Sequence, residues 1–240
     1  MSRHSLAEGE INLTAIGTLR SPFREKFGIP RQPGLATHAI SRLVLLPEYA
    51  SVECVEELSG FSHIWLLFLF HATMEQGWQP SVRPPRLGGN EHCGIFATRT
   101  MFRPSPVGLS AVELISIQQG EYGTELLLRG ADLLDGTPIL DIKPYLPYAD
   151  SITSAKAGYA VDAPPLLPVQ WSAQALADID ALPASADMRL LINEVLAQDP
   201  RPAYRAQHED NHEYGVWLAN INVRFSVSHQ VVQVVAVTER

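Results

Sequence analysis

The chain has 240 residues, of which 46% are hydrophobic and 18% are charged, and its formal net charge is −8 at pH 7. This composition is typical of a globular protein with one large domain or two smaller ones. The negative charge argues against indiscriminate nucleic-acid binding, which depends on a broad basic face.

Residues 11–19 alternate roughly between apolar and polar side chains and predict a first strand. The next residues, 23–35, show neither a helical nor a strand period, and an irregular segment of this length in a compact domain usually has a function. Within it, Arg31, Gln32 and Pro33 combine hydrogen-bond donors with a stiff backbone. We therefore expect them to hold a ligand, the alternative being an ordinary surface loop.

A second strand is predicted over residues 40–46, and a short helix over 47–60, with a proline near its start and a glycine at its end. The continuous apolar run within 61–71 indicates a fully buried strand. His63 and His71 flank this run. A histidine at a strand end commonly forms a hydrogen bond at the rim, but strand ends are also where sites are built.

A proline-rich stretch between two predicted strands is the part of the chain most typical of a site. The strands are residues 94–98 and 109–117, and the sequence between them at 102–108 is FRPSPVG. Each proline fixes its own φ and favours an extended conformation of the residue before it, so Arg103 should be held in place. Gly108 would allow a ligand to approach the backbone closely. The alternative is an ordinary proline-rich corner of a barrel.

Residues 124–130 should pair with the 109–117 strand. Asp135 and Gly136 predict a turn, followed by a strand that ends near residue 145. Pro138 and Pro144 would confine that strand to the edge of a sheet.

The composition changes after residue 148, because 149–168 is rich in small, polar and proline residues, which is typical of a linker. Two helices, 172–182 and 186–198, should follow, and then a hairpin formed by 216–227 and 230–238. The second helix carries an apolar core stripe made of Met188, Leu191, Ile192, Val195 and Leu196.

The chain is thus predicted to have a β-rich domain over residues 1–150, a linker over 151–168 and a small α+β domain over 169–240. Charge is unevenly distributed along it. Between residues 76 and 108 the single acid Glu91 accompanies four arginines, Arg83, Arg86, Arg99 and Arg103. An anionic partner should therefore bind this region rather than the acidic segment that follows residue 150.

Cys54 and Cys93 fit neither a disulfide framework nor a structural zinc site. Residues 1–10 lack the apolar segment of a secretory signal peptide, and the longest apolar run, 64–70, is too short to span a bilayer. We therefore expect a cytoplasmic protein with reduced cysteines and no membrane span.

The sequence contains neither the glycine fingerprint of a dinucleotide-binding fold nor a P-loop. The segment from His208 to His212 formally matches the HExxH motif of zinc hydrolases. A zinc site needs both histidines on one face of a stable helix and a third ligand, and Asp210 and Asn211 disfavour that helix. We expect a solvated loop here, and no metal site.

Nine segments, in order along nearly the whole chain, carry a family resemblance. They are RQPG (31–34), FSHIW (61–65), FH (70–71), RPPRLGGN (83–90), FATR (96–99), FRPSPVG (102–108), DLLDGTP (132–138), DIKPY (141–145) and DPRPAY (199–204). Together they resemble the TrmO-type (TsaA-like) tRNA (adenine-N6)-methyltransferases.

This resemblance implies an α+β protein in which a single-sheet β-barrel is followed by a small C-terminal α+β domain. It also implies a homodimer that uses S-adenosylmethionine near the subunit interface to methylate N6 of threonylcarbamoyladenosine at position 37, in the anticodon stem-loop of tRNA. The residues implied to bind the cofactor are Arg31, Gln32, Pro33, Phe70, His71, Arg103, Leu114, Leu134, Asp135, Gly136 and Thr137.

Methyl transfer from a sulfonium depends chiefly on positioning, which stiff loops can provide, and the rings of Phe70 and Phe102 could stabilise the sulfonium charge. The acceptor nitrogen must lose a proton, for which the candidates are His71, Asp135 and Asp141. The candidates for clamping the threonyl carboxylate are Arg99, Arg103 and Lys143. Tyr145 and Tyr148 would either stack on anticodon-loop bases or belong to the barrel rim.

Two other functions fit parts of the sequence. A β-barrel that binds RNA or a small anion without catalysis would use the same cationic loops, but it would not bind S-adenosylmethionine. A zinc hydrolase would use the HExxH segment and would contain metal.

Overall fold

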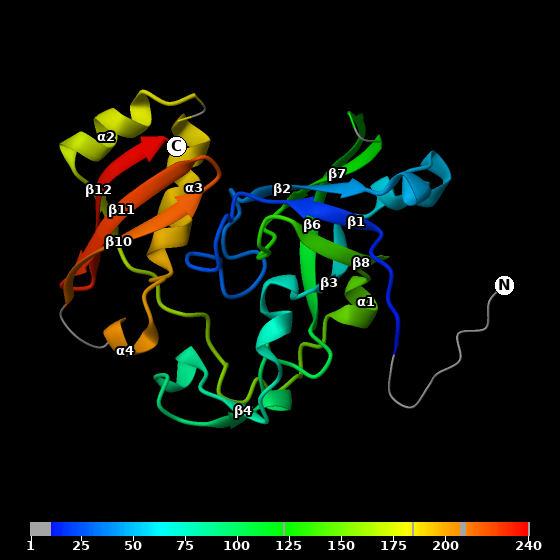
Figure 1. Ribbon diagram of the computed structural model, residues 1–240, viewed down its shortest axis with the longest axis horizontal. Helices are drawn as coiled ribbons and strands as arrows, with labels where there is room; N and C mark the ends of the chain where they lie inside the picture. The colour runs from blue at the N-terminus through cyan, green and yellow to red at the C-terminus, as the bar shows by residue number, and fades with distance from the viewer. Residues whose placement is uncertain (1–10, 122, 184, 207–209, 240) are drawn as a thin grey trace.

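Six antiparallel strands close into a barrel in the computed structural model, which describes residues 11–121, 123–183, 185–206 and 210–239 (Figure 1). The strand order around the barrel differs from the order in the chain. It is β1 (Gly17–Arg20), β2 (Ile40–Leu45), β7 (Gly123–Arg129), β6 (Val107–Gly120), β3 (His63–Leu69) and β8 (Thr137–Pro144). The predicted barrel is confirmed.

Alternation along the strands fills the barrel interior. On β3, Ile64, Leu66 and Phe68 are buried, whereas the residues between them are partly exposed. The prediction of a fully buried strand over 61–71 was wrong, because β3 is part of a barrel wall with one face inward and one outward. The other inward side chains of the barrel core include Leu19, Leu43, Val112, Leu126, Leu128 and Ile139.

The strand that contains Pro138 and Pro144 is not at an edge. β8 pairs with β1 on one side and with β3 on the other, because closure of the barrel leaves no edge. Both prolines lie near the ends of β8, where the loss of an N–H donor disturbs the ladder least.

Three further sequence predictions need correction. The first strand begins at Gly17 rather than at residue 11. The predicted helix over 47–60 is a series of three 3-10 turns, because the chain is extended at Ser51 and Glu56 and left-handed at Glu57. Of the predicted strand over 94–98, only residue 94 is in a strand. It belongs to β5 (Cys93–Gly94), which pairs with β4 (Ser81–Val82), and a 3-10 turn follows.

The C-terminal part of the chain is a four-stranded sheet with helices packed against it (Figure 1). Its strands, in spatial order, are β10 (Asp210–Leu218), β11 (Ile221–Ser228), β12 (Val231–Glu239) and β9 (Val169–Trp171), the last parallel to β12. The helices of this part are α2 (Ala173–Asp180), α3 (Ser185–Ala197) and the short α4 (Ala203–Ala206), while α1 (Pro147–Asp150) follows the barrel. Within the described ranges, no helix has the length and apolar character that a membrane crossing requires.

Most predictions for this part are confirmed. Ser172 caps α2, its hydroxyl accepting from the Ala175 amide at 3.0 Å, and the predicted apolar stripe of α3 lies in the core. The predicted strand over 216–227 is divided by a turn, since Ala219 has a left-handed φ of 51°. Residues 210–214 belong to β10 and not to a solvated loop, and His208 lies outside the described residues. No cluster of metal-binding side chains occurs in the part of the chain that the structure describes.

The irregular segment 21–39 lies between the barrel and the C-terminal sheet, and its apolar side chains belong to the core of the latter (Figure 1). Phe23, only 1% exposed, packs in the same cluster as Phe225 of β11. The segment is also bonded to the sheet through its backbone, since the Ala219 amide donates to the Pro22 carbonyl at 2.6 Å. The C-terminal sheet therefore supports the loop that carries Arg31.

Gly108 is required by a packing contact within the barrel. A Cβ at this position would lie 2.2 Å from the Phe68 ring, so the Phe68 side chain already approaches the backbone closely here. We expect Gly108→Ala to lower the free energy of unfolding by about 1–3 kcal/mol through overpacking. The Cβ that Gly60→Ala adds would meet no atom within 4 Å, so this control should change the free energy of unfolding by no more than about 0.5 kcal/mol. Both variants are measured by urea titration. Equal effects of the two substitutions would contradict this account.

Candidate functional site

A cavity of about 1200 Å³ opens on the outside of the barrel, where β3 ends and β6 begins. Six separate segments of the chain and Tyr159 form most of its walls. The lining includes Arg31 to Pro33, Phe68 to Thr73, Ser81 to Arg86, Thr98 to Arg103, Val107 to Ser110, and Asp132 to Leu134 with Thr137. The two stiff loops that the sequence marked as candidate sites, around Arg31 and Arg103, therefore meet at this cavity.

The cavity is strongly cationic although the chain as a whole is negative. Among its described lining residues Asp132 is the only carboxylate. The cations are Lys26, Arg31, Arg83, Arg86, Arg99 and Arg103. An anionic ligand would therefore be attracted here and repelled by much of the remaining surface.

Backbone and side-chain bonds hold the loop with Arg31, Gln32 and Pro33 against the barrel. The Gly34 amide donates to the Gly130 carbonyl at 2.8 Å, and Gly34 has a left-handed φ of 77° that suits glycine. Arg99 Nη1 donates to Gln32 Oε1 at 2.5 Å across the cavity. The pKa of Arg31 is lowered chiefly by desolvation, an effect that Asp199 opposes and Arg86 reinforces.

Arg103 is held in place, as predicted, but by its own side-chain bonds. Its Nη1 donates to the Thr98 carbonyl at 2.8 Å and to the Ile95 carbonyl at 3.3 Å. The guanidinium also lies 5.8 Å from the centre of the Phe96 ring. These contacts tie the proline-rich loop to the 3-10 turn before it.

Phe70 and His71 enter the cavity directly after β3. The Phe70 amide donates to the Pro106 carbonyl at 2.8 Å, so the proline-rich loop is bonded to the end of β3. The Phe70 ring packs edge-on against Phe68 with 5.1 Å between ring centres. His71 starts a 3-10 turn whose first residues line the cavity. Aromatic and imidazole groups therefore lie beside the cations.

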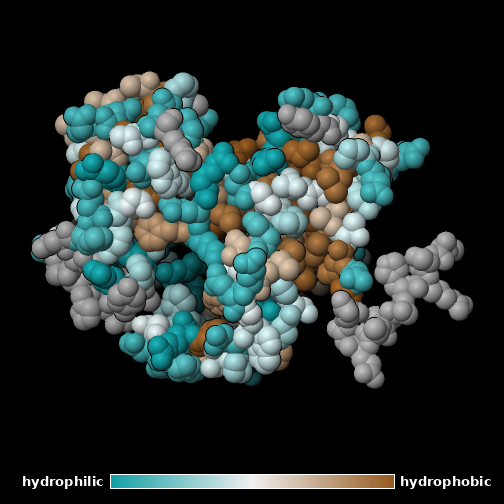
Figure 2. All heavy atoms as spheres, viewed as in Figure 1, coloured by the Kyte–Doolittle hydropathy of each residue, from teal (hydrophilic) through white to brown (hydrophobic). Residues whose placement is uncertain are grey.

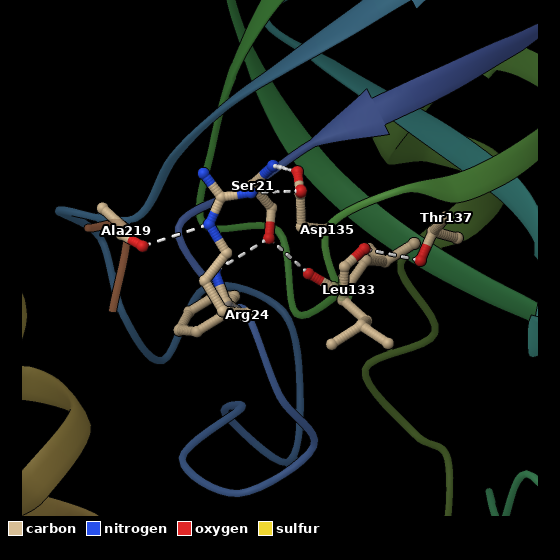
Figure 3. Close-up of polar contacts among 8 residues, drawn as sticks. Ser21, Arg24, Leu133, Asp135, Thr137 and Ala219 are labelled. Carbon is tan, nitrogen blue, oxygen red and sulfur yellow. Dashed lines mark hydrogen bonds and ion pairs between the residues drawn. The ribbon is translucent and has the colours of Figure 1, made fainter. Parts of the chain in front are cut away.

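The Leu134–Thr137 turn forms as predicted, with a left-handed φ of 82° at Gly136. Leu134 and Thr137 line the cavity, but Asp135 does not. Its carboxylate points toward the start of the 21–39 segment, where it pairs with Arg24 and accepts from the Ser21 amide at 2.9 Å (Figure 3). The Arg24 Nε also donates to the Ala219 carbonyl at 3.1 Å, which links the turn to the C-terminal sheet.

Most residues predicted from the resemblance are brought together. Those that line the cavity are Arg31, Gln32, Pro33, Phe70, His71, Arg99, Arg103, Leu134 and Thr137. Those that do not line it are Leu114, Asp135, Gly136, Asp141, Lys143 and Tyr145.

The residues outside the cavity have other surroundings. Leu114 is buried in the barrel core. Asp141 and Lys143 of β8 form an ion pair at 2.8 Å. Tyr145 packs on Trp65 with 5.5 Å between ring centres, and Trp65 itself lines the cavity. The highly exposed Tyr148 is not part of the barrel core.

Sequence reasoning missed two polar residues of the cavity. Asp132 accepts a 2.6 Å hydrogen bond from the Ser110 hydroxyl, and desolvation raises its pKa from 3.8 to about 6. Asp132 is the first residue of the DLLDGTP motif, but the Asp-Gly pair later in that motif is a turn signal and made Asp135 the predicted site residue.

Tyr159 comes from the predicted linker and donates its hydroxyl to the Ala97 carbonyl at 3.0 Å. No sequence pattern in the linker indicated that contact.

Comparison with known proteins identifies the family. The family described as tRNA-methyltransferase O N-terminal domain matches residues 18–151, and the TrmO C-terminal domain matches residues 164–240. The chain belongs to the TrmO family. The resemblance inferred from the nine TrmO motifs is thereby confirmed.

Relatives in the TrmO family are similar over almost the whole chain. The tRNA (adenine(37)-N6)-methyltransferase of Escherichia coli is 48% identical over 227 residues, which cover 94% of this chain and 97% of that protein. A Pseudomonas aeruginosa protein named as a putative S-adenosylmethionine-dependent methyltransferase is 48% identical over 216 residues, which cover 89% of this chain and 91% of that protein. The crystal structure of TrmO from Pseudomonas aeruginosa superposes with a TM-score of 0.77 at 40% identity, covering 95% of this chain and 98% of that one.

Proposed function

We propose that this protein is an S-adenosylmethionine-dependent tRNA methyltransferase that methylates N6 of adenosine 37, and that this adenosine carries a threonylcarbamoyl group. The observation that carries the proposal is the convergence of nine motif residues on one cationic cavity, in a chain that belongs to the TrmO family. The threonylcarbamoyl group follows from the resemblance and from the chemistry of the cavity.

The cavity residues fit S-adenosylmethionine. A volume of about 1200 Å³ exceeds the roughly 300–1000 Å³ of ordinary small-molecule pockets, so it has room for both the cofactor and a nucleobase. The rings of Phe70 and Phe102 offer faces for a sulfonium, worth about 1 kcal/mol each. When bound, the cofactor supplies an electrophilic methyl group. The residues that would hold it are Arg31, Gln32, Pro33, Phe70, His71, Arg103, Leu134 and Thr137.

Binding through the Leu134–Thr137 turn would not use the amides of Asp135 and Gly136, because both already donate to carbonyls of the chain. The Asp135 amide donates to the Phe23 carbonyl at 2.8 Å, and the Gly136 amide donates to the Leu19 carbonyl at 2.9 Å. The turn is thus fixed by the end of β1. Contacts of the cofactor with Leu114, Asp135 and Gly136 stay predictions from the resemblance.

Arg99 is the cation best suited to clamp the threonyl carboxylate. Its exposed guanidinium donates one bond to Gln32, which leaves four N–H donors in a planar fork. Arg103 already donates to two carbonyls, and Lys143 is paired with Asp141 away from the cavity. Tyr145, which packs on Trp65 at the edge of the cavity, would offer a ring for an anticodon-loop base.

We expect Arg99→Ala to reduce the affinity for tRNA carrying threonylcarbamoyladenosine by roughly 10- to 100-fold, because a charge-assisted hydrogen bond is lost. The affinity for tRNA without that group should change much less. Arg224→Ala, which removes an exposed arginine of β11, is the matched control. Binding measured by fluorescence anisotropy with both tRNAs tests this, and an equal loss on both would contradict the clamp.

We also infer a homodimer located in the cytoplasm, where the tRNA substrate is found. Hydrophobic side chains gather on the surface of the barrel (Figure 2). Leu109, 53% exposed, lies on the outside of β6 and also lines the cavity, so a second subunit packed on β6 would lie beside the site. Sedimentation velocity of the protein and of Leu109→Glu tests this inference, since a monomer in both cases would contradict it.

The experiment that tests the function is methylation in vitro. The purified protein, S-adenosylmethionine and tRNA carrying threonylcarbamoyladenosine are incubated, and the nucleosides are analysed by mass spectrometry. We expect one additional methyl group on that nucleoside. Calorimetry with S-adenosylmethionine separates an enzyme from a non-catalytic RNA-binding barrel, which should produce no heat of binding.

A further inference from the structure

Asp132 is the single carboxylate among the described residues of the cavity, and a serine of β6 holds its side chain in position. The Ser110 hydroxyl, which is buried, donates to Asp132 Oδ1 at 2.6 Å. A carboxylate has two oxygens and about four acceptor positions, so this bond orients the group and leaves capacity for another donor. The side chain remains partly exposed toward the cavity.

The surroundings of Asp132 suit proton transfer near neutral pH. Desolvation raises its pKa to about 6, while the Ser110 hydrogen bond, its own backbone amide and the charge of Arg99 oppose the shift. Across the cavity the titratable group from the end of β3 is His71. A base whose pKa lies close to the working pH is both ionised and basic enough to accept a proton efficiently.

The other candidate carboxylates are already engaged outside the cavity. Asp135 pairs with Arg24 and the Ser21 amide, as Figure 3 shows, and Asp141 pairs with Lys143. Neither lines the cavity. Asp132 is therefore the carboxylate that could contact a nucleobase bound beside Phe70 and Leu134.

We propose that Asp132 is the general base that accepts the N6 proton of the target adenosine, an assignment that rests on the proposed methyltransferase function. The N6–H bond breaks and its proton moves to an Asp132 oxygen. The nitrogen uses its electron pair to form the new bond to the methyl carbon, and the bond from that carbon to sulfur breaks with its pair kept by sulfur. The positive sulfonium becomes a neutral thioether, and Asp132 releases the proton to solvent through the open cavity.

Asp132→Asn tests the assignment, because the amide oxygen can still accept from Ser110 but the group cannot take up a proton at neutral pH. We expect kcat on threonylcarbamoyladenosine-containing tRNA to fall by roughly 10²- to 10⁴-fold. The dissociation constant of S-adenosylmethionine, measured by calorimetry, should be unchanged. The matched control is Asp187→Asn, an exposed carboxylate of α3, which should leave both quantities unaltered.

The pH dependence gives a second readout. The kcat of the unaltered protein should fall below pH about 6 as Asp132 becomes protonated. This acid limb of the pH–rate profile should be absent from the residual activity of Asp132→Asn. Ser110→Ala removes a bond that lowers the pKa of Asp132, so it should move the limb to higher pH. A purely structural role would leave the position of the limb unchanged.

Thermal unfolding provides a readout that does not involve activity. Because the folded-state pKa of Asp132 lies above its ordinary value of 3.8, its protonated form stabilises the folded protein below that value. This contribution is lost as the pH rises toward about 6. Asp132→Asn should therefore unfold at a higher temperature than the unaltered protein at pH 8, and the gain should shrink toward pH 4.

Several results would overturn the assignment, of which two concern Asp132→Asn alone. One is full kcat of Asp132→Asn, and the other is a loss of cofactor affinity with kcat intact at saturation, which would make Asp132 a cofactor-binding residue. Inactivity of the unaltered protein on this tRNA would instead contradict the proposed function itself. Retention of the acid limb in Asp132→Asn, combined with its loss in His71→Ala, would transfer the role to His71.

Discussion

Replacing Phe23 by alanine is expected to lower the free energy of unfolding by about 3–5 kcal/mol, because it leaves a cavity in a well-packed core. Phe23 is 1% exposed and lies in the core of the C-terminal sheet, although it directly follows β1 of the barrel. The loss should be measured by urea denaturation. It would reach a large part of the total stability of a typical domain.

The same substitution should also weaken S-adenosylmethionine binding, because Phe23 anchors the segment that carries Arg31 to Pro33. The Asp135 amide donates to the Phe23 carbonyl, so displacement of the backbone would disturb the Leu134–Thr137 turn as well. Phe96→Ala is the matched control, since that ring is 79% exposed. It should cost about 1 kcal/mol or less, through its contact with Arg103. Cofactor affinity that stays intact in folded Phe23→Ala would contradict the anchoring role.

This anchoring could not be predicted from the sequence. The period of residues 23–35 is neither helical nor strand-like, and the partners of Phe23 on β10 and β11 are about 200 residues away in the chain. Local patterns identify strands such as β2, β6 and β7, helix α2, and helix α3 with its apolar stripe, because those depend on residues close in sequence. They carry no information about which of two cores an isolated aromatic residue joins.

The site was predictable where a motif specified the residues and unpredictable where burial decided their role. Arg31, His71 and Arg103 meet at one cavity, as their motifs indicated. Asp135 was favoured over Asp132 because the Asp-Gly pair is a strong turn signal. The burial that raises the pKa of Asp132 arises from tertiary contacts.

Replacing Arg201 by methionine is expected to lower the free energy of unfolding by about 3–5 kcal/mol, because it leaves the Asp199 carboxylate unpaired in a poorly solvated place. Arg201 is only 2% exposed, and it holds Asp199 with two bonds of 2.7 and 2.8 Å. Asp199 adopts a left-handed φ of 47° just after α3, so the pair also fixes the end of that helix.

Arg224→Met is the matched control, because it breaks a pair of the same chemistry on the surface. Arg224 bonds to Glu213 at 2.6 Å, but both side chains are 46% exposed, and such pairs contribute about 0–1 kcal/mol. The double variant Asp199→Asn with Arg201→Met should be more stable than Arg201→Met alone, since the carboxylate that lost Arg201 is replaced by a neutral amide. Equal losses for the Arg201 and Arg224 variants in urea titrations would show that burial does not control the strength of these pairs.

The Arg201 pair should also affect the cavity, because Asp199 acts electrostatically on Arg31 and raises its pKa against the effect of desolvation. Without Arg201, the negative charge of Asp199 is less neutralised and acts more strongly on Arg31. We expect folded Arg201→Met to bind tRNA more weakly, with a smaller dependence of the affinity on salt, since one cation is less available to phosphate. A salt dependence identical to that of the unaltered protein would show that the C-terminal part stabilises the fold without influencing the charge of the cavity.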